Sequence, residues 1–334
     1  MKRPALPFPP KRLAQALPFF AAALLFSACE KEITVDLPDT PERLVVEGSI
    51  EPGLPPLVIL TRTQGYFAPT DLRSLAAMFV RGATVVVTDN TTGTPVTLDQ
   101  INSGGLSGEQ LAAIATATGL DPALLAGADI CAYTKLDNSI TGTIGHTYTL
   151  NIASGEHALS AVSTIPHPVP LDSTWFRLAH ARPDDDSLGY AWGRITDPDT
   201  LGNGYRWYAR RIGHRANGDV KDPTFISPLG STYNDKYING LAFDFNVIRG
   251  RQFYSDNEED KNEEAGYFKV GDTIEVRFLS IGMKEYDFYT TYDNNVASAG
   301  DLFSTPANVK TNVTGGLGVW CGRSVYTDTI ICKP

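Results

Sequence analysis

Residues 273–280, with the sequence TIEVRFLS, show the pattern that decides the fold. The apolar side chains of Ile274, Val276 and Phe278 alternate with charged side chains at the positions between them. Successive side chains of a β-strand point to opposite faces of a sheet, so the alternation indicates a strand with one buried face. The stretch predicts a strand of a sheet that covers a hydrophobic core.

Similar short runs, rich in β-branched and aromatic residues, recur along the chain and are separated by turn sequences. They are residues 44–50, 57–61, 83–89, 94–98, 147–152, 158–164, 173–178, 188–195, 204–211, 312–320 and 325–331. Short runs at this spacing are typical of antiparallel sandwiches. We therefore expect an all-β fold of two β-sandwich domains, Ig-like or jelly-roll-like, with a small helical insertion in the first.

Two stretches depart from the strand pattern. Residues 101–130 are rich in alanine, and within them Gly108–Ala115 favours helix by propensity. Asp121 followed by Pro122 is typical of a second helix start. The aromatic residues from Tyr286 to Tyr292 stand at near-helical spacing and predict a short helix.

Proline-rich segments indicate the domain boundaries. Residues 165–170 carry three prolines, which stiffen the chain toward polyproline II and mark the exit from the first domain. The expected organisation is a signal peptide at 1–28, a tether at 29–39, a first sandwich at 40–168 with a helical insert at 101–130, and a second sandwich at 169–334.

The N-terminus has the layout of a secretory signal. Four basic residues precede an apolar run, Leu13–Phe26, that ends in small residues and is too short to span a bilayer. Cys29 directly follows Ser27 and Ala28, which resembles the lipobox of bacterial lipoproteins. That resemblance implies that the Cys29 thiol is diacylated and becomes the mature N-terminus; the alternative is a plain secreted protein.

The residues after Cys29 bear on where the protein is displayed. Glu30-Lys31-Glu32 follows at once and resembles the surface-export signal of Bacteroidota lipoproteins. We therefore expect an outer-membrane, lipid-anchored protein exposed at the cell surface. The alternative is that these charges form an ordinary solvated tether.

Composition and motifs argue against several functions. The formal net charge is −10 and no Lys/Arg-rich cluster interrupts it, so nucleic acid is not an expected partner. The sequence contains no HExxH, CxxC, G-x-S-x-G or P-loop motif. We expect no catalytic residues, no metal site and no enzymatic activity.

No cofactor is expected, although two acidic loops offer a weak possibility of calcium binding. Residues 184–186 and 256–264 concentrate carboxylates, and calcium takes several oxygen ligands. Neither loop shows the ordered spacing of a dedicated calcium site, so solvated acidic loops are the favoured interpretation. The lipid on Cys29 is the expected covalent group.

The cysteines leave several pairings open. With Cys29 lipidated, Cys131, Cys321 and Cys332 remain, and an odd number leaves at least one of them free or paired between molecules. Cys321 and Cys332 are close enough in sequence to form a disulfide across a final hairpin in an oxidising compartment.

Aromatic residues crowd residues 205–254, the loop-rich part of the second domain. Tyr205 and Trp207 alternate within a predicted strand and are expected to fill the core. Aromatic residues in exposed loops more often contact a ligand or a protein. The candidate contact surface consists of Tyr233, Tyr237, Phe253 and Tyr254.

Several motifs occur in the order found in one known family. They are residues 29–38, 44–48, 144–150, 165–173, 286–289, 303–309 and 315–320. On these motifs the chain resembles domain-of-unknown-function family 4249 of Bacteroidota cell-envelope lipoproteins. The resemblance implies a lipoprotein often found beside TonB-dependent receptors, and it supplies no catalytic residues.

The expected function is therefore a non-enzymatic binding or accessory subunit of a TonB-dependent uptake receptor, held at the membrane by its lipid. One alternative is a structural or adhesion module of the cell surface. A hydrolase with an unmarked site is the remaining alternative.

Overall fold

The structure is a computed structural model, and most of the chain after residue 40 belongs to one compact unit, Pro41–Pro334. The described residues are 41–65, 72–118, 125, 127, 129–180, 186–251, 258–262, 264–298 and 308–334. Several predictions fall outside them, namely the signal peptide 1–28, the acylated Cys29, the tether 29–39, the start of the second insert helix at 121–124, and the contact residues Phe253 and Tyr254.

The first half of the unit is built mainly from strands. They are β1 (Leu44–Ile50), β2 (Leu57–Arg62), β3 (Thr84–Asp89), β4 (Thr94–Thr97), β5 (Asp99–Asn102), β6 (Cys131–Thr134), β7 (Thr147–Ser154) and β8 (His157–Thr164). Helix α2 (Leu72–Met78) was not predicted, whereas α3 (Gly108–Thr118) confirms the helix expected from propensity. Ser107 and Gln110 form a capping box at the start of α3, each side chain bonding the other's backbone N–H.

The second half continues with strands and one long helix. The elements are β9 (Ser173–Leu178), β10 (Leu188–Thr196), β11 (Gly204–Ile212), β12 (Thr232–Asn234), β13 (Ala242–Val247), β14 (Phe268–Lys269), β15 (Thr273–Ile281), β16 (Val313–Thr314), β17 (Leu317–Ile331), and the helices α5 (Glu258–Lys261) and α6 (Met283–Ser298). Two short 3-10 turns, η2 (Ser103–Gly105) and η3 (Asp235–Tyr237), complete the described elements. The helix expected at 286–292 is present and extends beyond both predicted ends.

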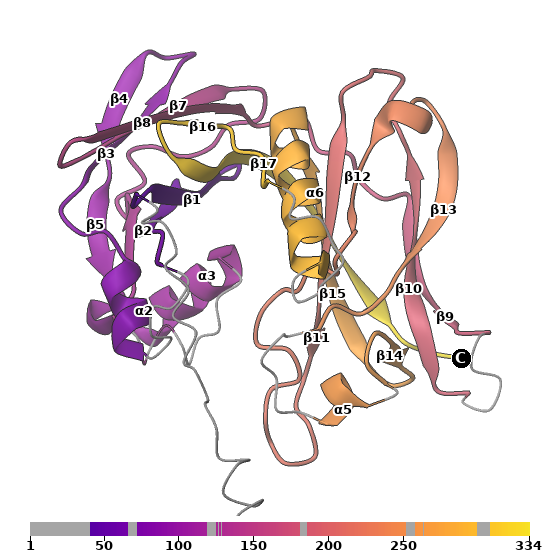
Figure 1. Ribbon diagram of the computed structural model, residues 1–334. Coiled ribbons are helices and arrows are strands. Elements are labelled where there is room, and N and C mark those ends of the chain that lie inside the picture. The colour runs from indigo at the N-terminus through magenta and orange to yellow at the C-terminus, as the bar shows by residue number, and fades with distance from the viewer. Residues whose placement is uncertain are drawn as a thin grey trace, which may run out of the picture. The chain divides into compact units, whose positions relative to one another are not determined.

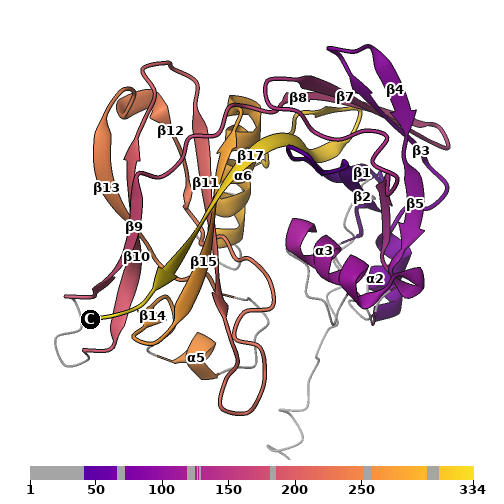
Figure 2. The same ribbon diagram turned by 180° about the vertical axis from the view of Figure 1, so that it is seen from behind.

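Three sheets form a sandwich-type all-β fold (Figures 1 and 2). The largest has eight strands in the order β12-β11-β15-β17-β1-β2-β6-β5. Its first-half strands share one buried cluster with the five-stranded sheet β16-β8-β7-β3-β4, and its second-half strands share another with the sheet of β9, β10, β13 and β14. The predicted all-β sandwich class is therefore confirmed.

Strand β17 joins the two halves of the chain (Figure 1). Its first residues, Leu317–Gly322, pair in parallel with β1, and Arg323–Ile331 pair antiparallel with β15. The two strands predicted at 312–320 and 325–331 are thus mostly one, and the β1–β17 pair departs from the expected antiparallel arrangement. The expected boundary between 168 and 169 lies between β8 and β9, but β16 and the start of β17 pair with strands of the first half.

Helix α6 covers the other face of the large sheet. Phe278 belongs to the sandwich core, while its neighbour Leu279 belongs to a separate buried cluster with Val319 and Cys321. Because alternate residues of a strand face opposite sides, this second cluster lies on the face away from the sandwich cores. Tyr286, Phe288 and Tyr289 of α6 pack against it.

The Cys321–Cys332 disulfide, one of the pairings that the sequence left open, does not form in the structure. Cys131, Cys321 and Cys332 are all free and buried, and each belongs to a different hydrophobic cluster. Cys321 lies near the start of β17 and Cys332 directly follows its end. At about 3.3 Å per residue the two lie roughly 30 Å or more apart, well beyond disulfide reach, because no hairpin turns between them.

Candidate functional site

Tyr237 is the more exposed of the two predicted contact residues that the structure describes, with 81% of its surface accessible. It ends the turn η3, which is fixed at its start because the side chain of Asn234 accepts a hydrogen bond from Lys236 N at 3.2 Å. The buried carboxylate of Asp235 accepts bonds from the backbone N–H groups of Gly202 and Asn203 at 2.7 and 2.8 Å. Tyr237 is therefore an exposed aromatic residue on a firmly held backbone.

A pocket of about 430 Å³ lies beside Tyr237, where β12 and β13 end their respective sheets. Its wall is mainly aromatic and aliphatic, because the core between the sheets reaches the surface here. Trp207 and Tyr233 each contact Phe245 edge-on, with ring centroids 6.0 and 5.8 Å apart. Trp207 Nε1 and the Tyr233 hydroxyl are buried without a hydrogen-bond partner among the described residues.

A second pocket of about 430 Å³ adjoins the first and shares Pro228, Leu229 and Ile248 with it. Leu229 and Ile248 are 38% and 49% exposed, so the shared wall presents apolar surface to solvent. Arg249 and Arg251 lie on the far side of the second pocket. We call the two pockets together the aromatic groove.

The structure brings together half of the predicted contact residues. Tyr233 and Tyr237 line the same pocket, whereas Phe253 and Tyr254 lie outside the described residues. Tyr205 and Trp207 are fully buried, as predicted for core residues. The contributions of Leu229 and Ile248 were missed, because a single apolar residue in a loop gives no sequence signal of its neighbours in space.

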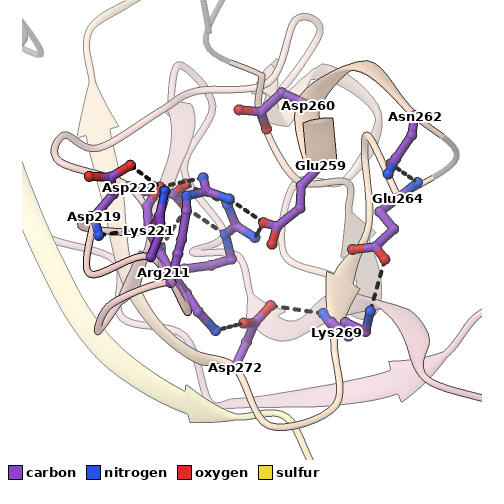
Figure 3. A network of polar contacts seen from close by, with 12 residues as sticks. Arg211, Asp219, Lys221, Asp222, Glu259, Asp260, Asn262, Glu264, Lys269 and Asp272 are labelled. Atoms are coloured by element: carbon purple, nitrogen blue, oxygen red, sulfur yellow. Dashed lines mark hydrogen bonds and ion pairs between the residues drawn. The ribbon is translucent and has the colours of Figure 1, made fainter. Parts of the chain in front are cut away.

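The acidic run at 256–264 is an ion-pair network in its described part, rather than a solvated loop (Figure 3). Arg211 lies between Asp222 and Glu259, with N–O distances of 2.8 and 2.9 Å. Asp260 accepts a bond from Arg249 at 2.5 Å. Burial alone would raise the pKa of Glu259, but the charges and hydrogen bonds of Arg211 and Arg215 hold it below its ordinary value.

The ion pairs of this network argue against calcium binding at the acidic run. Glu264 pairs with Lys269 at 2.8 Å, and Lys221 pairs with Asp272 at 2.6 Å. Carboxylates that already bind arginine or lysine are poor ligands for a further cation. Among the described residues, no group of three or more metal-ligating side chains comes together.

Of three comparisons with known proteins, one gave a match. The profile of the family described as Domain of unknown function (DUF4249) matches residues 30–329. No curated protein and no solved structure matches the chain. Within the described part of the chain, no helix has both the length and the apolar character needed to cross a membrane. Since the profile spans most of the sequence, the chain belongs to the DUF4249 family.

Proposed function

We propose that this protein is a surface-exposed outer-membrane lipoprotein that acts as a non-enzymatic binding or accessory subunit of a TonB-dependent uptake receptor. The aromatic groove of the second half supplies the contact surface for the receptor. The lipid on Cys29 and the tether that follows hold the protein beside it.

The exposed, firmly held Tyr237 at the groove is the observation that carries this proposal. Binding energy at protein interfaces concentrates in a few aromatic and arginine residues that fill pockets. Because the backbone at Tyr237 is already fixed, binding there costs little backbone conformational entropy. Tyr237, Leu229 and Ile248 together present apolar surface around a concavity, which is typical of an interaction site.

The lipid anchor supports the same proposal because it raises the effective concentration of the protein beside a membrane-bound partner. Two or more acyl chains give stable membrane attachment, whereas one gives only marginal binding. Confining two partners to one membrane raises their effective concentration, so a modest contact surface suffices. Arg249, which lines the groove, is itself paired with Asp260 at 2.5 Å, so its charge is already balanced before docking.

The test is a pull-down from detergent-solubilised membranes of native cells, using the lipidated protein. We expect a TonB-dependent receptor to co-purify. Tyr237→Ala should weaken the complex about 30-fold, because losing a central aromatic contact costs about 2 kcal/mol. The matched control is Leu136→Ala, which removes a residue that is 53% exposed in the first half of the chain.

Two results would contradict the proposal: a protein that purifies alone, or a complex that Tyr237→Ala and Leu136→Ala leave equally strong. The test uses point variants rather than a deletion of the loop-rich segment 213–265, because that segment contains β12, β13 and core residues such as Phe245.

The location of the protein is tested separately. Cys29→Ala should release the protein from membranes and abolish palmitate labelling, and added protease should digest the wild type on intact cells.

A further inference from the structure

A third pocket, separate from the aromatic groove, lies between helix α6 and strands β1, β11 and β17. Its volume is about 420 Å³, within the range of small-molecule sites. Strand β1 contributes Glu47, β11 contributes Tyr208, and α6 contributes Phe288 and Tyr292. With Tyr289, also of α6, the pocket combines one carboxylate with four aromatic rings. Arg206 lines it as well, and its guanidinium lies over the rings of Tyr289 and Tyr208, 4.5 and 5.4 Å from their centroids.

Glu47 has no partner in this pocket. No hydrogen bond or ion pair joins its carboxylate to any residue that the structure describes, although its side chain is exposed. The pocket walls displace only part of the water around this exposed side chain. This desolvation raises the pKa of Glu47 above its ordinary value of 4.5, and the charge of Arg323 offsets the effect only in part.

The two nearby arginines are already engaged. Both terminal nitrogens of Arg206 bind the carboxylate of Asp293, at 3.0 and 3.1 Å. Arg323 binds Glu51 at 2.7 Å. Asp293 neutralises Arg206, whereas Arg323 shares the carboxylate of Glu51 with Arg277, so its positive charge partly offsets that of Glu47. Among the described residues, Glu47 supplies the one carboxylate that lines the pocket.

Two of the aromatic residues that line the pocket stack on each other along α6. Phe288 and Tyr292 are four residues apart on α6, and their rings stack with centroids 6.0 Å apart. Tyr292 is 47% exposed, and its pKa is raised first by partial burial and then by the charge of Glu47, which places the phenol within electrostatic range of the carboxylate. Aromatic faces attract cations through their quadrupole, most strongly where water is excluded.

We infer that this pocket binds an organic ammonium ion, with Glu47 as its counter-ion and Tyr208, Phe288 and Tyr292 as aromatic walls. A hard metal ion is disfavoured because calcium needs six or more oxygen ligands and the pocket offers one carboxylate. An anion is disfavoured because the negative charge of Glu47 would repel it. An ammonium group with methyl or methylene substituents satisfies both the carboxylate and the rings.

The experiment measures binding of choline and tetramethylammonium to the full chain by titration calorimetry and by the chemical shifts of aromatic protons. Choline should bind with a Kd of about 1 mM or tighter. Its neutral isostere 3,3-dimethylbutan-1-ol should bind at least about tenfold more weakly, since it keeps the shape and lacks the charge.

Two variants assign the binding to this pocket. Glu47→Gln keeps the size of the side chain and should weaken choline binding about tenfold, whereas Glu42→Gln, at an exposed ion pair with Arg62, should leave it unchanged. Tyr292→Leu should weaken binding while leaving thermal unfolding near that of the wild type. The inference is overturned by equal affinity for choline and its neutral isostere, by equal binding to wild type and Glu47→Gln, or by no saturable binding of either cation.

Discussion

The carboxylate of Glu51 and the guanidinium of Arg323 are in contact at 2.7 Å, although 272 positions separate them in the sequence. Glu51 directly follows β1, and Arg323 lies at the point where β17 leaves β1 and joins β15. Arg277 of β15 binds the second oxygen of the same carboxylate at 2.8 Å. This buried cluster therefore ties the first strand of the unit to two strands of the second half.

Replacing Glu51 should destabilise the whole unit. Glu51→Gln leaves Arg277 and Arg323 buried without their countercharge, and removing one partner of a buried ion pair costs about 3–5 kcal/mol. The measurement is the free energy of unfolding in guanidinium chloride. Glu42→Gln is the matched control, because its exposed pair with Arg62 should contribute about 1 kcal/mol or less. Equal losses in the two variants would contradict the structural role of the cluster.

The contribution of Glu51 should depend on pH in a defined direction. Burial alone would raise the pKa of Glu51, but the charges and hydrogen bonds of Arg323 and Arg277 lower it below the ordinary value of 4.5. A lowered pKa in the folded state stabilises the fold above the ordinary value, and this stabilisation is lost as the pH falls through the lowered one. The difference in unfolding free energy between wild type and Glu51→Gln should therefore be constant above pH 4.5 and shrink below it.

That pH dependence is best measured as a difference between two proteins, because other carboxylates titrate in both. Glu285 shows the opposite behaviour to Glu51, because its pKa in the folded protein is raised. Burial raises its pKa, and its recorded partners Ser163 and Asn312 are neutral. A difference between wild type and Glu51→Gln that stays constant into strong acid would show that Glu51 is not held ionised.

The three cysteines should be unreactive in the folded protein. Burial raises the pKa of Cys321 and of Cys332 to about 12, and the thiolate is the reactive form. A chain that begins after Cys29 should react negligibly with a thiol reagent when native and should expose three thiols per chain when unfolded without reductant. A single thiol per unfolded chain would instead reveal a disulfide.

Local sequence patterns predicted most of the longer strands, because the signal for a strand lies within the strand. The strands β5, β6, β12, β13 and β14 were not predicted. The alternation at 273–280 became β15, and the capping residues Ser107 and Gln110 mark a helix that propensity had already indicated. Pairing across the chain gives no such signal. The parallel contact of β1 with β17, the Arg211–Glu259 pair and the three separate clusters of the cysteines depend on which segments meet after folding.

The sequence likewise predicted only part of the candidate site. Tyr237 was singled out because aromatic residues in loop-rich segments are often exposed, and it is. The pocket beside it forms only where the edges of two sheets meet, so Leu229 and Ile248 could not be assigned to it. Glu47 was not singled out from the sequence, because its pocket depends on α6, which is far away in the sequence.

Gly318 should be one of the least replaceable residues of the chain. It has a positive φ of 97°, and a Cβ added there would lie 1.9 Å from the carbonyl oxygen of its pairing partner Val46. The absence of a side chain thus permits β17 to lie against β1, which gives a physical reason for the glycines in the 315–320 motif. Gly202 is the matched control, because its φ is 110° and nothing lies within 4 Å of an added Cβ.

Gly202→Ala should cost only the backbone strain, about 1 kcal/mol. Gly318→Ala adds a clash with fixed backbone and should cost about 2 kcal/mol more, because β17 must move away from β1. The measurement is the unfolding free energy of each variant, together with hydrogen exchange of the β1 amides, which should accelerate in Gly318→Ala and remain slow in Gly202→Ala. Equal costs for the two variants would mean that backbone strain alone explains the glycine at 318 and that the close approach of the two strands tolerates a side chain.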